Sequence, residues 1–168
     1  LICLTACGNG IISQLLSSGK IDEAEKTLLR LKSIYQDNLG IEIQANNMER
    51  NQSFFSERID QKFLNRKLID FGKKHNIKIV ATSNSHYLLK EEHKVHDVLL
   101  AIGSHQPVYS NFRLKYNVPD FYLKSGEEIK SFFSRNFGEE FAQSVCDNSV
   151  YFANLCEVPD WIDPKYSN

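Results

Sequence analysis

Two side chains that can bind a divalent metal follow buried, strand-like runs of the sequence. Cys7 ends the apolar run Leu1–Cys7, and His86 follows the run Ile77–Thr82 after three small polar residues. Thiolate and imidazole are good ligands for zinc and related metals. Because parallel strands present their carboxyl ends to one side of a sheet, we expect both residues at the same mouth. Asn84 stands where such a site would favour a carboxylate, so a small buried thiol and a polar loop histidine remain the alternative.

A second candidate for metal binding lies on a helix that we expect to begin near Glu91. His93, His96 and Asp97 are spaced so that they share one face of this helix. One helical turn can supply two metal ligands. The charged residues around His93 are more typical of a solvated surface, so a helix face without a ligand is the favoured alternative.

Basic and aromatic side chains gather in the irregular segment that follows. Arg113 and Lys115 lie next to Phe112 and Tyr116, and Lys124 comes shortly after them. Such a mixture can contact phosphates and stack on bases, so the three cations are candidates for nucleic-acid contact. The same side chains would also suit a loop that packs on its neighbours, and this alternative stays open.

Composition and the absence of known motifs exclude several functions. A net charge of -1 and a pI near 6.6 provide no global basic field for holding nucleic acid. The sequence contains no Gly-rich phosphate loop, no G-x-S-x-G and no Asp-x-Asp pair that could hold two magnesium ions. It has neither a signal-peptide pattern nor a run near the ~20 apolar residues of a membrane span. We therefore expect a cytoplasmic protein with no membrane partner and with reduced cysteines.

Strand-like and helix-like segments alternate along the first two thirds of the chain. Short apolar runs predict strands, and apolar residues at three- and four-residue steps predict helices. This alternation indicates an α/β fold with parallel strands and crossover helices. The expected strands are Leu1–Cys7, Gly40–Gln44 and Ile77–Thr82, and the expected helices are about Ile11–Ser18, Asp22–Gln36, Ile59–Lys74 and Glu91–Ile102.

The last third of the chain predicts a long connection followed by helices. The irregular stretch Gly103–Asp120 has a length typical of functional or domain-crossing loops. Ser125 and Glu128 have the spacing of a capping box, which predicts a helix, and another helix is expected over about Glu139–Glu157. Three parallel strands alone would leave exposed edges, so we expect their missing partners in residues that precede Leu1.

Several motifs, taken in order, resemble a known family. These are LICLTACGNGII, IEIQ, VATSNSHYL, HDVLLAIGS, FYLKSGEEI and NLCEV. Together they are similar to the last part of the PHP (polymerase and histidinol phosphatase) domain in the alpha-subunit family of bacterial replicative DNA polymerase III. The match runs without a gap from Val80 to Ser125, and the motifs span nearly the whole chain.

The resemblance implies part of a (β/α)7 PHP barrel with a divalent metal cluster of zinc, manganese or magnesium at the carboxyl ends of its strands. Residues 1–103 would form the second half of this barrel, 104–124 a long loop with the FYLKS segment, and 125–168 helices that lead to the polymerase core. Cys7 falls on the family's cysteine ligand, His86 on its last histidine ligand and Asn84 on an aspartate. The other family ligands would precede Leu1.

The amide at Asn84 binds a divalent ion more weakly than a carboxylate, because it carries no charge. We therefore expect a degenerate metal site in a structural part of a replicative DNA-directed DNA polymerase, a nucleotidyltransferase. The partners that the resemblance implies are the rest of the polymerase chain, the proofreading exonuclease subunit, other replisome subunits and, through the full-length protein, DNA. The alternative is an active metal-dependent phosphoesterase of the 3′–5′ exonuclease or histidinol phosphatase type.

Overall fold

The fold is built around a small parallel sheet. The computed structural model describes residues 1–49, 60–116 and 118–156. In these residues β1 (Cys3–Leu4), β2 (Leu39–Gln44) and β3 (Lys78–Thr82) pair in the order β1-β2-β3, and both pairings are parallel. The predicted α/β class with parallel strands is confirmed. The described strands form an open sheet, so the closed barrel stays a prediction.

Strand β1 is much shorter than the expected Leu1–Cys7. Its pairing continues as far as Thr5, whose backbone N–H donates to the carbonyl of Gly40 at 3.1 Å. The Thr5 hydroxyl then accepts from the backbone N–H of Glu42 at 2.9 Å. Ala6 follows with φ 64°, in the left-handed region, and this turns the chain out of the sheet before Cys7. The apolar run did not reveal this turn, because alanine gives no turn signal.

Helices cover one face of the sheet and its β1 side. They are α1 (Ile11–Ser17), α2 (Ile21–Tyr35) and α3 (Gln61–His75), close to their expected ranges. Helix α3 begins where the carboxylate of Asp60 accepts from the backbone N–H of Phe63 at 2.9 Å, and the expected start at Ile59 lies outside the described residues. Apolar side chains of these helices, of β2 and β3, and of the later helices form the core; its fully buried members include Ile12, Leu28, Ile41, Ile43 and Leu64.

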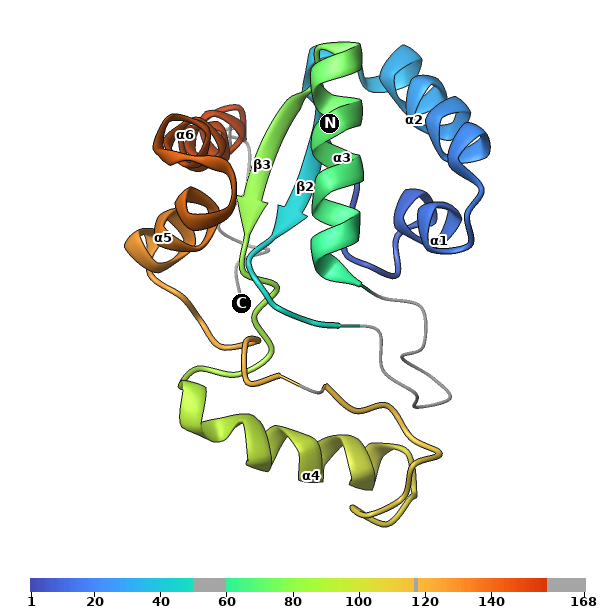
Figure 1. The fold of residues 1–168 in the computed structure, drawn as a ribbon, viewed down its shortest axis with the longest axis vertical. Coiled ribbons are helices and arrows are strands. Elements are labelled where there is room, and N and C mark those ends of the chain that lie inside the picture. Colours follow the sequence, from blue (N-terminus) through green and yellow to red (C-terminus); the bar gives the residue numbers. More distant parts are fainter. Residues whose placement is uncertain (50–59, 117, 157–168) are drawn as a thin grey trace, which may run out of the picture.

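Two further helices lie beside β3, on the side away from α1 and α2 (Figure 1). Helix α5 (Gly126–Phe137) begins at the predicted capping box, in which Ser125 and Glu128 bond reciprocally. Helix α6 (Glu139–Asn154) follows at once, and the expected end at Glu157 lies outside the described residues. The side-chain amide of Asn148 donates to the carbonyl of Ile79 at 2.9 Å, so α6 covers part of the free β3 edge.

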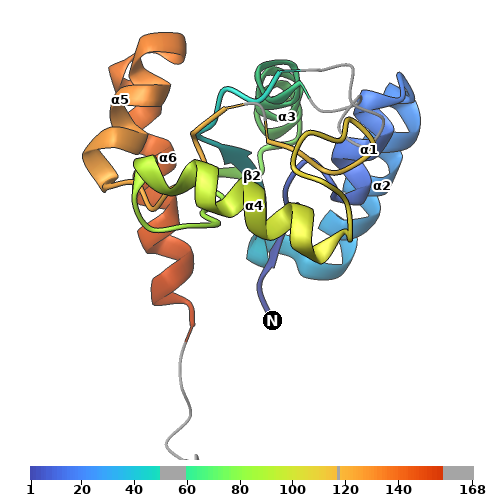
Figure 2. The ribbon, with the colours of Figure 1, turned by 90° about the horizontal axis from the view of Figure 1, so that it is seen from below.

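Helix α4 (His93–Gly103) lies apart from the other helices, on the side to which β2 and β3 point (Figures 1 and 2). The 3-10 turn η2 (Lys90–Glu92) precedes it, and an irregular chain returns from it to the sheet. A parallel bridge between Tyr87 and Tyr122 ties the two connections together. Among the described residues, no helix is long and apolar enough to cross a membrane.

We predict that Gly72→Ala destabilises the fold. A Cβ atom at Gly72 would lie 2.6 Å from Cγ1 of the buried Ile79 and 3.3 Å from the carbonyl oxygen of Ile77. Helix α3 would then have to move away from β3, at a cost of about 1–3 kcal/mol in the free energy of unfolding. Gly103→Ala is the control, because its Cβ would meet nothing within 4 Å. Urea unfolding checks this, and equal stabilities of the two variants would contradict it.

Candidate functional site

The candidate site lies where the chain leaves β1 and β3. His86 packs its imidazole on the ring of Tyr116, with the ring centroids 5.1 Å apart. Burial and, secondly, the charge of the nearby Cys7 raise the pKa of the Tyr116 hydroxyl. Cys7 and His86 thus come near the same tyrosine, although they are far apart in the sequence.

The turn that carries His86 has a constrained backbone. Asn84 has φ 50°, in the left-handed region, which asparagine adopts more readily than most residues. The hydroxyls of Ser83 and Ser85 bond to each other at 2.8 Å, and that of Ser85 also donates to the carbonyl of Tyr122 at 3.2 Å. Asn84 therefore fits its backbone position, while its amide supplies no negative charge to a metal.

Three rings pack against His86, which is itself exposed. The ring of Phe121 lies 5.5 Å from His86 and 4.2 Å from Tyr116, and His96 of α4 lies 5.5 Å from His86 and stacks on Tyr116 at 5.6 Å. Tyr87 lies 5.2 Å from His96. We call these five residues the aromatic cluster. Sequence reasoning missed Phe121 as a neighbour of His86, because the contact joins residues 35 positions apart.

The surroundings of the two histidines lower the pKa of both. Burial lowers the pKa of His86 below 6.5. Burial also lowers the pKa of His96, the positive charge of His86 lowers it further, and Asp97 opposes both effects. At neutral pH each ring therefore has one nitrogen that can accept a hydrogen bond or bind a metal.

The three residues of the second candidate for metal binding have separate partners in the structure. Among residues 1–49, 60–116 and 118–156, no group of three or more His, Cys, Asp or Glu side chains could hold a metal ion. His93 contacts the carbonyl of Lys90 at 3.2 Å, His96 belongs to the aromatic cluster, and Asp97 pairs with Arg113. Helical spacing placed the three on one face, but each has a different partner.

The residues present at the first candidate site do not complete a metal site either. Cys7 and His86 are the ligands that the family resemblance assigns there, and Asn84 offers a neutral oxygen. A structural zinc site takes four ligands and a catalytic one three from the protein. These residues alone therefore do not complete the ligand set of a resident metal.

Arg113 anchors the irregular segment to α4. Its side chain is buried, and its two terminal nitrogens donate to the carboxylate oxygens of Asp97 at 2.7 and 2.6 Å. It also donates to the carbonyl of Val108. The hydrogen bond from Arg113 is the main cause of the lowered pKa of Asp97. The guanidinium is thus engaged within the protein, as expected for a loop that packs on its neighbours, and the contact of Arg113 with nucleic acid stays a prediction.

The other two predicted nucleic-acid contacts are untested. Lys124 is half-buried, its ammonium donates to the carbonyl of Asp120, and it lies 4.3 Å from the ring centroid of Tyr122. Burial lowers the pKa of Lys124. Lys115 is half-buried, and its charge contributes to the lowered pKa of Asp97. Both cations thus have protein neighbours.

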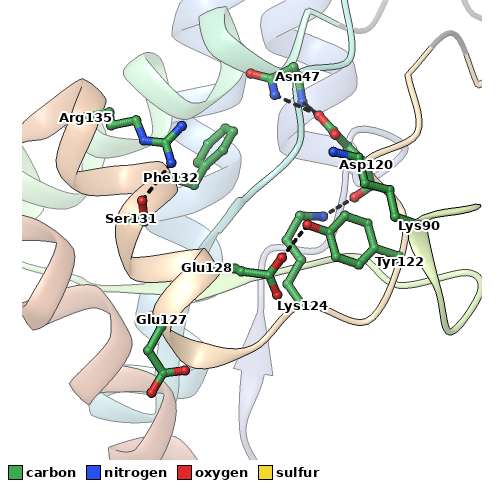
Figure 3. Close-up of a pocket in the computed structure, with 10 residues that line it drawn as sticks. All are labelled: Asn47, Lys90, Asp120, Tyr122, Lys124, Glu127, Glu128, Ser131, Phe132 and Arg135. Atoms are coloured by element: carbon green, nitrogen blue, oxygen red, sulfur yellow. Dashed lines mark hydrogen bonds between the residues drawn. The ribbon is translucent and has the colours of Figure 1, made fainter.

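A pocket of about 370 Å³ opens beside the FYLKS segment and carries charges of both signs (Figure 3). At one wall the backbone and side-chain N–H groups of Asn47 donate to the carboxylate of Asp120 at 2.8 and 2.7 Å. The hydroxyl of Tyr122 donates to Glu128 at 2.6 Å, and this bond is the main cause that raises the pKa of Tyr122 to about 12. Sequence reasoning missed this pocket, because its walls come from four separate segments.

Comparisons with known proteins place the motifs in a wider context. No family model matches the chain. It is 32% identical over 158 residues to the DNA polymerase III subunit alpha of Thermus aquaticus, covering 94% of this chain and 12% of that protein. It is 32% identical over 176 residues to that of Aquifex aeolicus, covering 95% and 14%. The subunit of Borreliella burgdorferi is 25% identical over 157 residues, covering 94% and 12%.

The predicted resemblance to DNA polymerase III alpha subunits is confirmed, since the similarity covers nearly all of this chain. The chain spans only 12–14% of the length of these relatives.

We predict that Asp97→Asn destabilises the protein by about 2–4 kcal/mol near neutral pH, because it leaves the buried Arg113 without a counter-charge. The folded-state pKa of Asp97 lies below 3.8, so its stabilisation is present above that pH and is lost as the pH falls through the folded value. The stability difference from the wild type should therefore shrink in acid. Urea unfolding across pH checks this, with the exposed Asp70→Asn as control. A difference that is constant with pH would contradict it.

We also predict that His86→Gln raises the pKa of His96 towards 6.5. The substitution removes the positive charge of protonated His86, which lowers the pKa of His96. Proton NMR titration of the imidazole C2–H signals measures the effect, and wild-type His86 and His96 should both titrate below 6.5. Exposed His105→Gln should leave the His96 titration unchanged. An unshifted His96 in His86→Gln would show that the two rings are not coupled.

Proposed function

We propose that this chain is a segment of the alpha subunit of a bacterial DNA polymerase III, a DNA-directed DNA polymerase of chromosome replication. The observation that carries the proposal is the similarity over 94% of the chain to alpha subunits from distant bacteria. The whole protein would act as a nucleotidyltransferase in the cytoplasm. Its partners would be the rest of the polymerase chain, the proofreading exonuclease subunit, other replisome subunits and, through the whole protein, DNA.

Within that subunit, the chain would form the second half of a PHP barrel and the start of the link towards the polymerase core. The parallel strand order and the crossover helices support this assignment. So does the position of Cys7 and His86, since both follow the carboxyl ends of strands. Helices α5 and α6 would begin the link, because they follow the FYLKS motif in chain order.

The metal site of this barrel would be degenerate, and the segment's contribution would be structural. Replacing a carboxylate by the amide of Asn84 removes one negative charge from the ligand set. Losing even an outer partner of a metal ligand typically costs 10–100-fold in affinity, so loss of a direct charged ligand costs at least as much. The aromatic cluster gives His86 packing partners that need no metal.

An active metal-dependent phosphoesterase is the second candidate. The observation that favours it is the retention of Cys7 and of a neutral His86 near the same tyrosine. If zinc, manganese or magnesium bound there, these two side chains would be the ligands that this chain supplies. The remaining ligands would come from other parts of the subunit.

We predict that His86→Ala, made in the polymerase that contains this chain, leaves primer extension unchanged. We also expect the wild type and the variant to show equally little metal-dependent 3′–5′ exonuclease activity. Both results follow from a site that lacks a carboxylate at Asn84. Exposed His105→Ala is the matched control. Robust exonuclease turnover that His86→Ala abolishes and His105→Ala spares would establish the phosphoesterase instead. A protein without primer-extension activity would overturn the polymerase assignment.

Metal content provides a readout independent of turnover. Elemental analysis should find less than one zinc, manganese or magnesium ion per wild-type protein, and no further loss in a Cys7→Ser, His86→Ala double variant. Asn84→Asp should raise the metal affinity by at least about tenfold, because it restores the carboxylate. Stoichiometric metal in the wild type that the double variant loses would contradict a degenerate site.

A further inference from the structure

Helix α4, which lies apart from the other helices, carries an exposed apolar stripe (Figures 1 and 2). Its spacing of three and four residues places the stripe on one face of the helix. Each member is between 42% and 64% exposed. Single apolar residues are normal on a protein surface, whereas a contiguous apolar patch marks a site of interaction. We call this set the α4 stripe; it consists of Val95, Val98, Leu99 and Ile102.

The other side of α4 holds the helix in this orientation. Asp97 accepts two hydrogen bonds from the buried guanidinium of Arg113, and His96 stacks on Tyr116. Ala101, one turn after Asp97, is 2% exposed. Turning the stripe towards the rest of the described residues would break the pairing of Asp97 with Arg113. The stripe therefore stays exposed unless a surface outside these residues covers it.

The chemistry of the α4 stripe favours a permanent apolar partner. All four side chains are aliphatic, so the stripe offers neither a charge nor a hydrogen bond. Permanent interfaces are more apolar than transient ones, and their centres are poor in charged residues. A partner that left would expose the stripe to water again. A surface that is always present avoids this cost.

The stripe is too small to hold a separate protein by itself. A stable interface between two proteins takes roughly 20–30 residues from each side. Helix α4 has 11 residues, and the exposed apolar side chains that follow it, Val108, Tyr109, Phe112 and Leu114, leave the apolar surface well below that size. A surface in the same polypeptide needs less contact, because covalent linkage gives it a high effective concentration.

We infer that the α4 stripe docks on an apolar surface formed by another part of the same polypeptide, outside residues 1–168. The inference rests on the proposed function, in which the chain is a segment of a much longer subunit. The similarity covers 94–95% of this chain but only 12–14% of its relatives, so most of such a subunit is available to supply the surface. Since His96 of α4 packs against His86, the docked part is linked through α4 to the candidate site.

Thiol labelling of the purified polymerase that contains this chain tests the docking. Leu99→Cys places a thiol in the stripe, and Ile34→Cys on α2 is the matched control, because the two natural side chains are 60% and 61% exposed. Ile34 does not share a face with Leu29, the other exposed apolar residue nearby on α2. Peptide mass spectrometry distinguishes the new thiols from the natural cysteines.

We expect maleimide to modify position 99 at least about fivefold more slowly in the folded polymerase than in urea, because a covered thiol reacts only when its surface opens. Position 34 should slow less. A smaller decrease at position 99 would overturn the docking. Equal slowing at both positions would show that the fold restricts the reagent everywhere, which would overturn it as well.

Photo-cross-linking identifies the surface that covers the stripe. Benzoylphenylalanine in place of Leu99, in the polymerase purified without other subunits, should cross-link to a peptide of the same polypeptide outside residues 1–168. A cross-link between two copies, one within residues 1–168, one that needs an added subunit, or none at all would overturn the inference. Primer extension by the same protein tests the polymerase assignment separately, so the two failures are distinguishable.

Discussion

The structure depends on strand β2, because the elements that carry the candidate site are arranged around it. Its backbone pairs with β1 on one side and β3 on the other, both in parallel. Ile41 and Ile43 are fully buried in the core on one face, which holds α3 against the sheet. Parallel pairing then places the carboxyl ends of β1 and β3 at one end of the sheet. Cys7 and His86 approach a common neighbour, Tyr116, for this reason.

The opposite face of β2 is polar. Glu42 accepts hydrogen bonds from Gln44 at 2.9 Å and from Thr82 of β3 at 2.8 Å. Gln44 is 2% exposed, and its side-chain oxygen has no partner among the described residues. A sheet with one apolar and one polar face is expected where the second face borders other polar groups or water. The alternation in IEIQ therefore supports the proposal that this face of β2 lines the interior of a barrel.

Sequence patterns within a few residues predicted the helices and strands. Contacts between residues far apart in the sequence determine which side chains surround the candidate site. The capping box at Ser125 was predicted because both partners lie within one helical turn. The pairing of Arg113 with Asp97 could not be predicted, because nothing in a single sequence links a loop cation to one acid among several. The left-handed conformation of Ala6 carries no signal, since alanine rarely adopts it. Strand ends thus predicted that Cys7 and His86 come near one another, whereas the neighbours of His86 depended on where the loop places α4.

The aromatic cluster changes how His86 is interpreted. Its position after a strand end matches that of a metal ligand in the family that the sequence resembles. Its ring now contacts His96, Tyr116 and Phe121, and its backbone N–H donates to the carbonyl of Phe121. These contacts join the end of β3 to α4 and to the FYLKS segment, so they stabilise the arrangement without any ion. A neutral His86 ring can make all of these packing contacts. Binding a divalent metal would also need a negative charge nearby, which the amide of Asn84 does not supply. A histidine in this position therefore has a structural reason to be there even where the metal site is incomplete.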